Sequence, residues 1–171
     1  MYQKIQRGIM NPTAKHAFLH FSNLRQRMNK IEHIGIAVKD LDLSCDLYEK
    51  LLGSPAYKLE LVASEGVSTA FFKTGENKIE LLAATAEDSP IAAFIEKKGE
   101  GIHHIAFDVT DIYAEMERLK NNGFVLLNNE PKMGADHKLI CFLHPKGTNG
   151  VLIELCQEID DAKGTKAIPH G

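Results

Sequence analysis

The sequence has few cysteines, no long apolar run and no excess of basic residues. Its three cysteines, Cys45, Cys141 and Cys156, form no C-x-x-C pair, and an odd number cannot all pair with one another. We therefore expect a reducing compartment, the cytoplasm, rather than a disulfide-stapled secreted domain. Cys141 and Cys156 lie in apolar strand-like runs, where small buried thiols are expected.

Charge and hydropathy disfavour two classes of partner. A net charge of −3 argues against nucleic acid as the main partner, because phosphate binding needs a basic field. No apolar run approaches the roughly 18 residues of a membrane span, so we expect no membrane partner. The length of 171 residues and the apolar share of 44% suit one globular domain or two small fused modules.

The first 29 residues differ in charge from the rest of the chain. They contain five basic residues and no acid, so they carry +5, which leaves −8 for residues 30–171. We interpret residues 1–29 as a basic N-terminal extension outside the fold. Acid-free basic leaders are also typical of transit peptides, so the alternative location is the mitochondrial matrix. Residues 158–171 are predicted to be a hydrophilic tail.

The strongest pattern is an internal repeat, in which IEHIGIAV returns 71 residues later as IHHIAFDV. The last strands match as well, since KIEL in the first copy aligns with LIEL in the second. Each copy therefore offers one histidine on its first strand and one glutamate on its last. The four residues are His33, Glu80, His104 and Glu154.

Each copy predicts the order β-α-β-β-β. In the first module, residues 31–83, a strand at 31–38 precedes a helix that Asp40 caps and Gly53 ends. The expected apolar face of this helix consists of Leu43, Leu47, Tyr48, Leu51 and Leu52. Three further strands follow, separated by turn residues, at 57–62, 67–73 and 78–82.

A short helix at 89–98, with Ser89 as its cap and proline at its first position, bridges the copies. The second module, residues 101–157, repeats the order, with a helix from Asp111 to Asn121. Its strands are expected at 102–109, 124–127, 138–143 and 150–156. Two such modules can pair their sheets edge to edge. We therefore predict an α+β fold over residues 30–157, with one curved mixed sheet around a metal-containing cleft.

The repeat makes a four-ligand metal site the leading hypothesis. Period-two alternation puts His33 and His104 on one face of their strands, and Glu32 and His103 on the opposite face. Gly35 marks a place where something approaches the backbone closely. Imidazoles and carboxylates without thiolates suit cobalt, zinc, manganese or nickel, with coordination positions left free for water or substrate. They do not suit a closed structural zinc site.

With these residues in hand, the sequence resembles the vicinal oxygen chelate superfamily and, within it, the methylmalonyl-CoA epimerases. The resemblance covers residues 30–157, and its most specific stretches are HIGIAVKDL, DSPIAAFI, GIHHIAFDV and HPKGTNGVLIEL. It implies a glyoxalase-like fold, a homodimer and a divalent metal ion. The metal positions of the family fall on His33, Glu80, His104 and Glu154.

The resemblance also implies a reaction, the epimerisation of (2R)- and (2S)-methylmalonyl-CoA. A proton leaves the carbon α to the thioester, a metal-stabilised enolate forms, and the proton returns on the other face. We expect Glu154 and Glu80 to act as both ligands and bases, with Glu65 as a third candidate. Some relatives place a glutamate base where this chain has Thr69, which cannot act as a carboxylate base.

A CoA-thioester substrate needs contacts for its phosphates outside the cleft. We expect Lys132, Lys146 and Gly147 to bind it, since lysine binds phosphate as a point charge. Two other functions fit the same fold: glyoxalase I (lactoylglutathione lyase) and a non-catalytic small-molecule-binding module. The stretches DSPIAAFI, PKMGA and HPKGTNGVLIEL favour the epimerases over the lyase, and the retained histidine-glutamate quartet disfavours the binding module.

Overall fold

The computed structural model describes residues 28–159. The strands are β1 (Met28–Ala37), β2 (Lys58–Val62), β3 (Val67–Thr74), β4 (Asn77–Ala84), β5 (Gly101–Val109), β6 (Lys132–Met133), β7 (Lys138–Leu143) and β8 (Leu152–Glu158). The helices are α2 (Leu41–Leu52), α3 (Pro90–Lys98) and α4 (Ile112–Asn121), with 3₁₀ turns η2 (Ala63–Glu65) and η3 (Pro145–Gly147). The predicted N-terminal extension lies outside the described residues except for its last two, and the predicted tail except for its first two.

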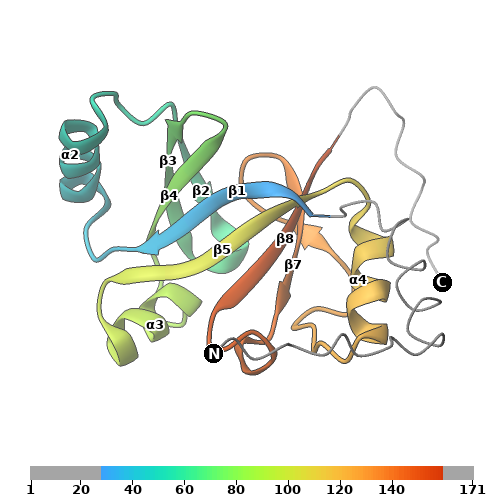
Figure 1. Cartoon of the computed structure of the whole chain (residues 1–171). Coiled ribbons are helices and arrows are strands. Elements are labelled where there is room, and N and C mark those ends of the chain that lie inside the picture. The colour runs from blue at the N-terminus through green and yellow to red at the C-terminus, as the bar shows by residue number, and fades with distance from the viewer. Residues whose placement is uncertain (1–27, 160–171) are drawn as a thin grey trace, which may run out of the picture.

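The described strands form one curved mixed sheet in the order β2-β3-β4-β1-β5-β8-β7-β6 (Figure 1). Within each module, the first and last strands pair in parallel, β1 with β4 and β5 with β8. The modules meet through the antiparallel pair β1 and β5, which cross the middle of the molecule. The predicted α+β fold, in which two β-α-β-β-β units join edge to edge, is therefore confirmed.

The helices begin at the side chains that the sequence offered as caps. Asp40 accepts a hydrogen bond from the backbone N–H of Leu43 at 3.0 Å, and Asp111 accepts one from Ala114 at 3.0 Å. Gly53 ends α2 with φ at 74°, a left-handed conformation that glycine adopts without strain. Among residues 28–159, no helix is long and apolar enough to cross a membrane.

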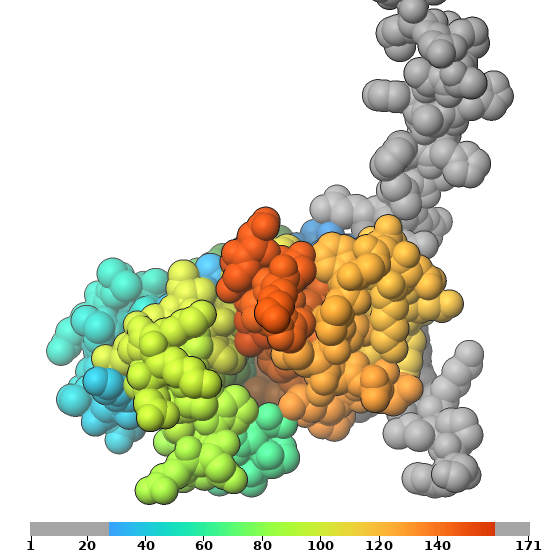
Figure 2. Space-filling model, turned by 90° about the horizontal axis from the view of Figure 1, so that it is seen from below, coloured from blue at the N-terminus to red at the C-terminus, as the bar shows by residue number. Residues whose placement is uncertain are grey.

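Each module has its own apolar core between its helix and its strands. Phe72 and Leu81 belong to the cluster under α2, and Met116 and Leu155 to the cluster under α4. Helix α3 packs differently, because its Ile91 lies against cleft-lining residues of the first module. Seen from below, α3 (yellow-green) lies with the first module, beside the orange second module (Figure 2). The first residues of α3, Pro90 and Ile91, therefore form part of the cleft wall.

The strand predicted at residues 124–127 is wrong, because the sixth strand is Lys132–Met133. Leu126 makes a single bridge to Leu143, and the ladder does not continue. The side-chain oxygen of Asn128 accepts the hydrogen bond of the Phe142 N–H at 3.3 Å. The Phe142 N–H is thus bonded to a side chain, and it is not available to pair with the backbone of residues 124–127 as a continued ladder would require.

The predicted apolar face of α2 is also partly wrong. Tyr48 and Leu52 pack on the sheet as expected. Leu43, Leu47 and Leu51 instead point outward and are 69%, 60% and 70% exposed. The helix presents Leu41 and Cys45 to the sheet together with Tyr48 and Leu52. Because successive residues are turned by about 100° around a helix, the other three leucines lie on the face toward solvent.

Candidate metal centre

A cleft of about 270 Å³ lies on the concave side of the sheet and is lined from both modules. His33 of β1 and Glu80 of β4 enter it from the first module, and His104 of β5 and Glu154 of β8 from the second. These four side chains are at most 6% exposed. The cleft therefore places four ionisable groups in a largely dry environment.

The four side chains converge on one another. The Nε2 atoms of His33 and His104 are 2.9 Å apart. Glu80 Oε2 lies 3.3 Å from His33 Nε2 and 3.5 Å from His104 Nε2. Glu154 reaches the same two nitrogens at 3.9 Å and 3.4 Å. His33, His104 and Glu154 each have a ligand atom within 4.8 Å of the others, so the group has the dimensions of a metal site.

The strand register explains this convergence. On the β1 side, Gly35 pairs with Glu80 and with His104. On the β5 side, Ala106 pairs with Glu154 and with His33. One small residue in each module therefore has a histidine on one flank and a glutamate on the other.

Gly35 is the residue over which His104 lies. A Cβ added to Gly35 would be 2.2 Å from Cε1 of the His104 ring, a distance that no side chain tolerates. The close approach predicted at this glycine is therefore a contact with an imidazole of the other module.

Two β-bulges overturn the predicted strand faces. In the β1–β5 ladder, Ile31 pairs with Phe107 and His33 with Ala106, so Glu32 is an extra residue. The same happens at His103, because the register steps directly from His104 to Ile102 of β5. A bulge breaks period-two alternation. Both extra residues therefore line the cleft, instead of lying on the opposite face.

Each bulge residue contacts the imidazole that follows it. Glu32 Oε2 lies 2.5 Å from Nδ1 of His33, and Nδ1 of His103 lies 2.9 Å from Nδ1 of His104. These contacts are on the far side of each ring from the converging Nε2 atoms. Strand alternation placed Glu32 and His103 on the opposite face and so predicted neither contact, although the two residues are aligned in the repeat.

The cluster favours positive charge. Burial lowers the pKa of His33, but hydrogen bonds with Glu32 and Glu80 and the charge of Glu154 outweigh it and raise that pKa to about 10. Burial raises the pKa of Glu80, whereas the two histidines lower it to about 2. For Glu154, burial dominates and raises the pKa. Glu32, Glu80 and Glu154 together thus favour positive charge on His33.

The donor set fits a divalent metal ion. The ion pairs that Glu80 and Glu154 make in the described part of the chain are with His33 and His104. Two carboxylates match the charge of a divalent cation, and imidazole nitrogen with carboxylate oxygen is a set that first-row transition metals accept. The structure therefore contains a group of potential metal ligands.

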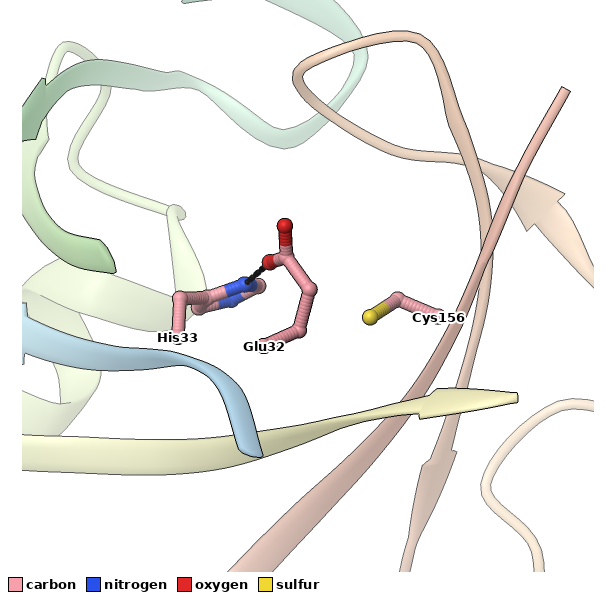
Figure 3. Close-up of side chains that lie close together, drawn as sticks. All are labelled: Glu32, His33 and Cys156. Atoms are coloured by element: carbon pink, nitrogen blue, oxygen red, sulfur yellow. Dashed lines mark hydrogen bonds and ion pairs between the residues drawn. The ribbon is translucent and has the colours of Figure 1, made fainter. Parts of the chain in front are cut away.

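A second group, Glu32, His33 and Cys156, also lies close enough to bind an ion (Figure 3). Two cations already face Glu32, because the Nζ atoms of Lys78 and Lys138 lie 2.5 Å and 3.5 Å from its Oε1. Burial raises the pKa of the Cys156 thiol, which disfavours the thiolate that a metal requires. This group is thus already neutralised without an ion.

The remaining predicted site residues are spread out. Lys132 lines the cleft, where its Nζ lies 2.6 Å from Oε1 of Glu65. Thr69 is buried in the cleft wall and donates a long hydrogen bond to the backbone oxygen of Glu60 at 3.5 Å. Lys146 and Gly147 form part of η3 and are not among the residues that line the cleft.

Known proteins resemble this chain over most of its length. It is 43% identical over 132 residues to the ethylmalonyl-CoA/methylmalonyl-CoA epimerase of Cereibacter sphaeroides, covering 76% of this chain and 98% of that protein. It is 40% identical over 131 residues to the mitochondrial methylmalonyl-CoA epimerase of Homo sapiens, covering 76% and 74%. A probable lactoylglutathione lyase of Vibrio cholerae is 29% identical over 132 residues, covering 75% and 91%.

A solved structure agrees with these relatives. A variant of the Streptomyces coelicolor methylmalonyl-CoA epimerase, in complex with 2-nitronate-propionyl-CoA, superposes with a TM-score of 0.75 at 36% identity, covering 78% of this chain and 99% of that one. The sequence profile of the Glyoxalase/Bleomycin resistance protein/Dioxygenase superfamily matches residues 32–142. The chain therefore belongs to this superfamily, in the branch that contains the methylmalonyl-CoA epimerases.

Proposed function

We propose that this chain is a metal-dependent epimerase that interconverts (2R)- and (2S)-methylmalonyl-CoA. One observation carries the proposal: two histidines and two glutamates, one of each from either module, converge in a buried cleft. The relatives named as epimerases support the reaction, at 43% and 40% identity. The lactoylglutathione lyase relative is more distant, at 29%.

The residues proposed to hold the ion are His33, Glu80, His104 and Glu154, through the two Nε2 atoms and one oxygen of each carboxylate. When bound, a divalent metal supplies a Lewis acid that stabilises the negative charge developing on a thioester oxygen. Cobalt, zinc, manganese and nickel all suit this donor set. Metal analysis of the purified protein, followed by stripping and add-back of each ion, identifies the one that restores activity.

The cleft also provides the carboxylates for proton transfer. Glu80 and Glu154 enter it from opposite modules, on strands that flank the central pair. That arrangement suits removal of the α proton on one face of the substrate and its return on the other. Positioned general acid–base groups typically contribute about 10²- to 10⁴-fold in rate. Glu65 is less available as a base, because Lys132 already pairs with it at 2.6 Å.

Deuterium exchange tests the two bases separately. Glu80→Gln and Glu154→Gln, each confirmed to retain metal, are incubated with each epimer in D₂O. We expect each variant to exchange one epimer much more slowly than the other. Wild-type exchange by both variants would show that neither glutamate is a base.

The overall activity is tested by two assays on one preparation. Epimer exchange of methylmalonyl-CoA should be fast and should stop when the metal is removed. Isomerisation of the hemithioacetal of methylglyoxal and glutathione, the reaction of the lyase, should be undetectable. The opposite pattern would establish the lyase, and neither activity would leave a binding module of the same fold.

We also propose that Lys132, Lys146 and Gly147 bind the CoA part of the substrate. Lys132 supports this by its place in the cleft wall, whereas Lys146 is exposed on the turn after β7. Removing either lysine should raise KM for methylmalonyl-CoA and leave KM for a truncated thioester unchanged. Equal effects on both substrates would rule out the phosphate contact.

The proposal includes a homodimer. The outward stripe of Leu43, Leu47 and Leu51 on α2 supports it, since exposed apolar stripes commonly mark interaction surfaces. Sedimentation velocity should give a dimer for the wild type and a monomer for Leu47→Glu.

The cytoplasmic location and its mitochondrial alternative stay predictions. Cell fractionation of the full chain and of a chain without residues 1–27 would separate them.

A further inference from the structure

The His33 imidazole is held from both sides. Its Nε2 faces the convergence point of the cleft, 2.9 Å from Nε2 of His104. Its Nδ1 faces Oε2 of Glu32 at 2.5 Å, the contact drawn in Figure 3. An imidazole that binds a metal through Nε2 carries its proton on Nδ1, where an acceptor fixes both the tautomer and the ring plane. Glu32 is that acceptor.

Glu32 is itself clamped in place. Its Oε2 accepts from His33, while its Oε1 faces the ammonium groups of Lys78 at 2.5 Å and Lys138 at 3.5 Å. Lys78 also reaches Oδ2 of Asp136 at 2.6 Å. Glu32 is 4% exposed, so few waters compete for either oxygen. A carboxylate with both oxygens engaged has little freedom to rotate away from the imidazole.

The β-bulge is what makes the contact possible. On a regular strand, Glu32 and His33 would point to opposite faces of the sheet, but the extra residue lets adjacent side chains share the cleft. The bulge therefore delivers a buried carboxylate to the rear of a candidate ligand, together with two lysines that neutralise it.

We propose that Glu32 is a positioning residue of the metal centre, which orients His33 through its Nδ1 proton. The residue acts through His33 and touches neither the ion nor the substrate. This inference rests on the proposed metal centre and deepens it. Acceptors of this kind typically contribute about 10- to 100-fold to metal affinity.

The test is a Co²⁺ titration of the metal-free protein, followed by calorimetry and by visible absorption. Glu32→Ala should lower the Co²⁺ affinity by about 10- to 100-fold, and Glu32→Gln, which keeps the shape but loses the charge, by about 10-fold. The matched control is Glu60→Gln. Glu60 accepts from the backbone N–H of Asp136 and pairs with Lys58 at 2.8 Å, but no contact joins it to His33. The Co²⁺ affinity of Glu60→Gln should equal that of the wild type.

A second readout needs no metal at all. In ¹⁵N-histidine-labelled, metal-free protein, the hydrogen-bonded Nδ1 proton of His33 should give a protected signal that Glu32→Ala abolishes and Glu60→Gln preserves. Glu32→Ala removes the carboxylate that Lys78 and Lys138 share, which destabilises the fold. Glu32→Gln then carries the comparison, with thermal unfolding as the check.

The outcomes separate the two proposals. If the wild type binds one Co²⁺ and the Glu32 variants bind it equally tightly, the positioning role is wrong and the metal centre stands. If the wild type binds no Co²⁺, both fall. Weaker binding in the Glu32 variants with full binding in Glu60→Gln supports the inference.

Discussion

The two modules place equivalent histidines by different physical means. In the first, His33 stands beside Ala106 and is held from behind by a charged group, Glu32 with its two lysines. In the second, the ring of His104 lies over Gly35 and makes an edge contact with Phe142, with ring centroids 5.7 Å apart. The residue behind His104 is another imidazole, His103, which in turn packs on Phe94.

The difference teaches that a repeat can keep the positions of its converging side chains while their surroundings change. His33 is oriented by charge, and the elevated pKa of its ring follows from that. His104 is oriented by shape, since a glycine makes room for it and aromatic rings limit its tilt. Four experiments test this contrast and the link between the modules, the largest expected effect first.

Gly35→Ala should have the largest effect. The new Cβ would overlap the His104 ring, so this side chain must leave its place. We expect a loss of Co²⁺ affinity beyond the roughly 100-fold that a change behind a ligand typically causes. Overpacking should also destabilise the protein by about 1–3 kcal/mol. Calorimetric titration and urea unfolding measure the two effects.

The control is Ala106→Gly, at the equivalent place in the second module. This variant should still bind one Co²⁺ per chain, with a stability loss of about 0.5–1 kcal/mol from the added backbone freedom. Equal damage by both variants would show that the modules do not differ in the way described.

His103→Phe should reduce the sensitivity of the fold to acid. Burial, with the neighbouring charge of His104, lowers the pKa of His103 to about 4, whereas an unfolded histidine titrates near 6.5. The unfolded chain therefore binds more protons between pH 6.5 and 4, and the free energy of unfolding falls as pH falls through that window. The loss attributable to His103 is on the order of 2 kcal/mol.

Urea unfolding of wild type and His103→Phe, at pH 7 and at pH 4.5, measures this loss. Titrating groups that do not contact His103 are common to both proteins and cancel in the comparison. The phenyl ring retains the packing on Phe94. An identical pH dependence in the two proteins would contradict the lowered pKa.

Metal binding at pH 7 should release about one proton per ion. The pKa of His33 is raised to about 10 in the metal-free protein, so this ring holds a second proton at neutral pH, which the ion must displace from Nε2. The apparent Co²⁺ affinity should rise about tenfold per pH unit from pH 6 to 8, and the rise should end near pH 10. Calorimetry in buffers of different ionisation enthalpy counts the protons, and binding without release would contradict the prediction.

Glu65→Gln should have the smallest effect. The Glu65–Lys132 pair joins the two modules across the cleft, but both side chains are about a third exposed, at 31% and 33%. Pairs of this kind contribute about 0.2–1 kcal/mol. A double-mutant cycle with Lys132→Met measures the coupling in the free energy of unfolding. A coupling well above that range would make this pair a main link between the modules.

Much of the fold follows from features that act locally. The repeat predicted two modules of the same element order, and Asp40, Gly53, Ser89 and Asp111 predicted helix ends because caps depend on adjacent backbone groups. The predictions failed where tertiary contacts decide. Residues 124–127 have strand-like composition, yet the side chain of Asn128 interrupts their ladder.

For the candidate site, alignment of the repeat selected the four converging side chains, because a duplication preserves strand positions. It could not place Glu32 and His103 in the cleft. A β-bulge depends on the register between two strands, and the hydrophobic alternation along one strand does not reveal it. The metal-binding and catalytic roles of the four residues stay predictions. The pairing of Lys132 with Glu65 joins residues 67 apart in the chain and lies beyond any local pattern.

The central β1–β5 pair has a consequence for the ancestry of the molecule. Each half of the chain contributes two of the four converging groups, and the glycine or alanine that pairs with one half's histidine belongs to the other half. A solitary ancestral half would thus have owned an incomplete pocket. It would complete the group only by pairing with a second copy of itself along the edge that β1 and β5 share.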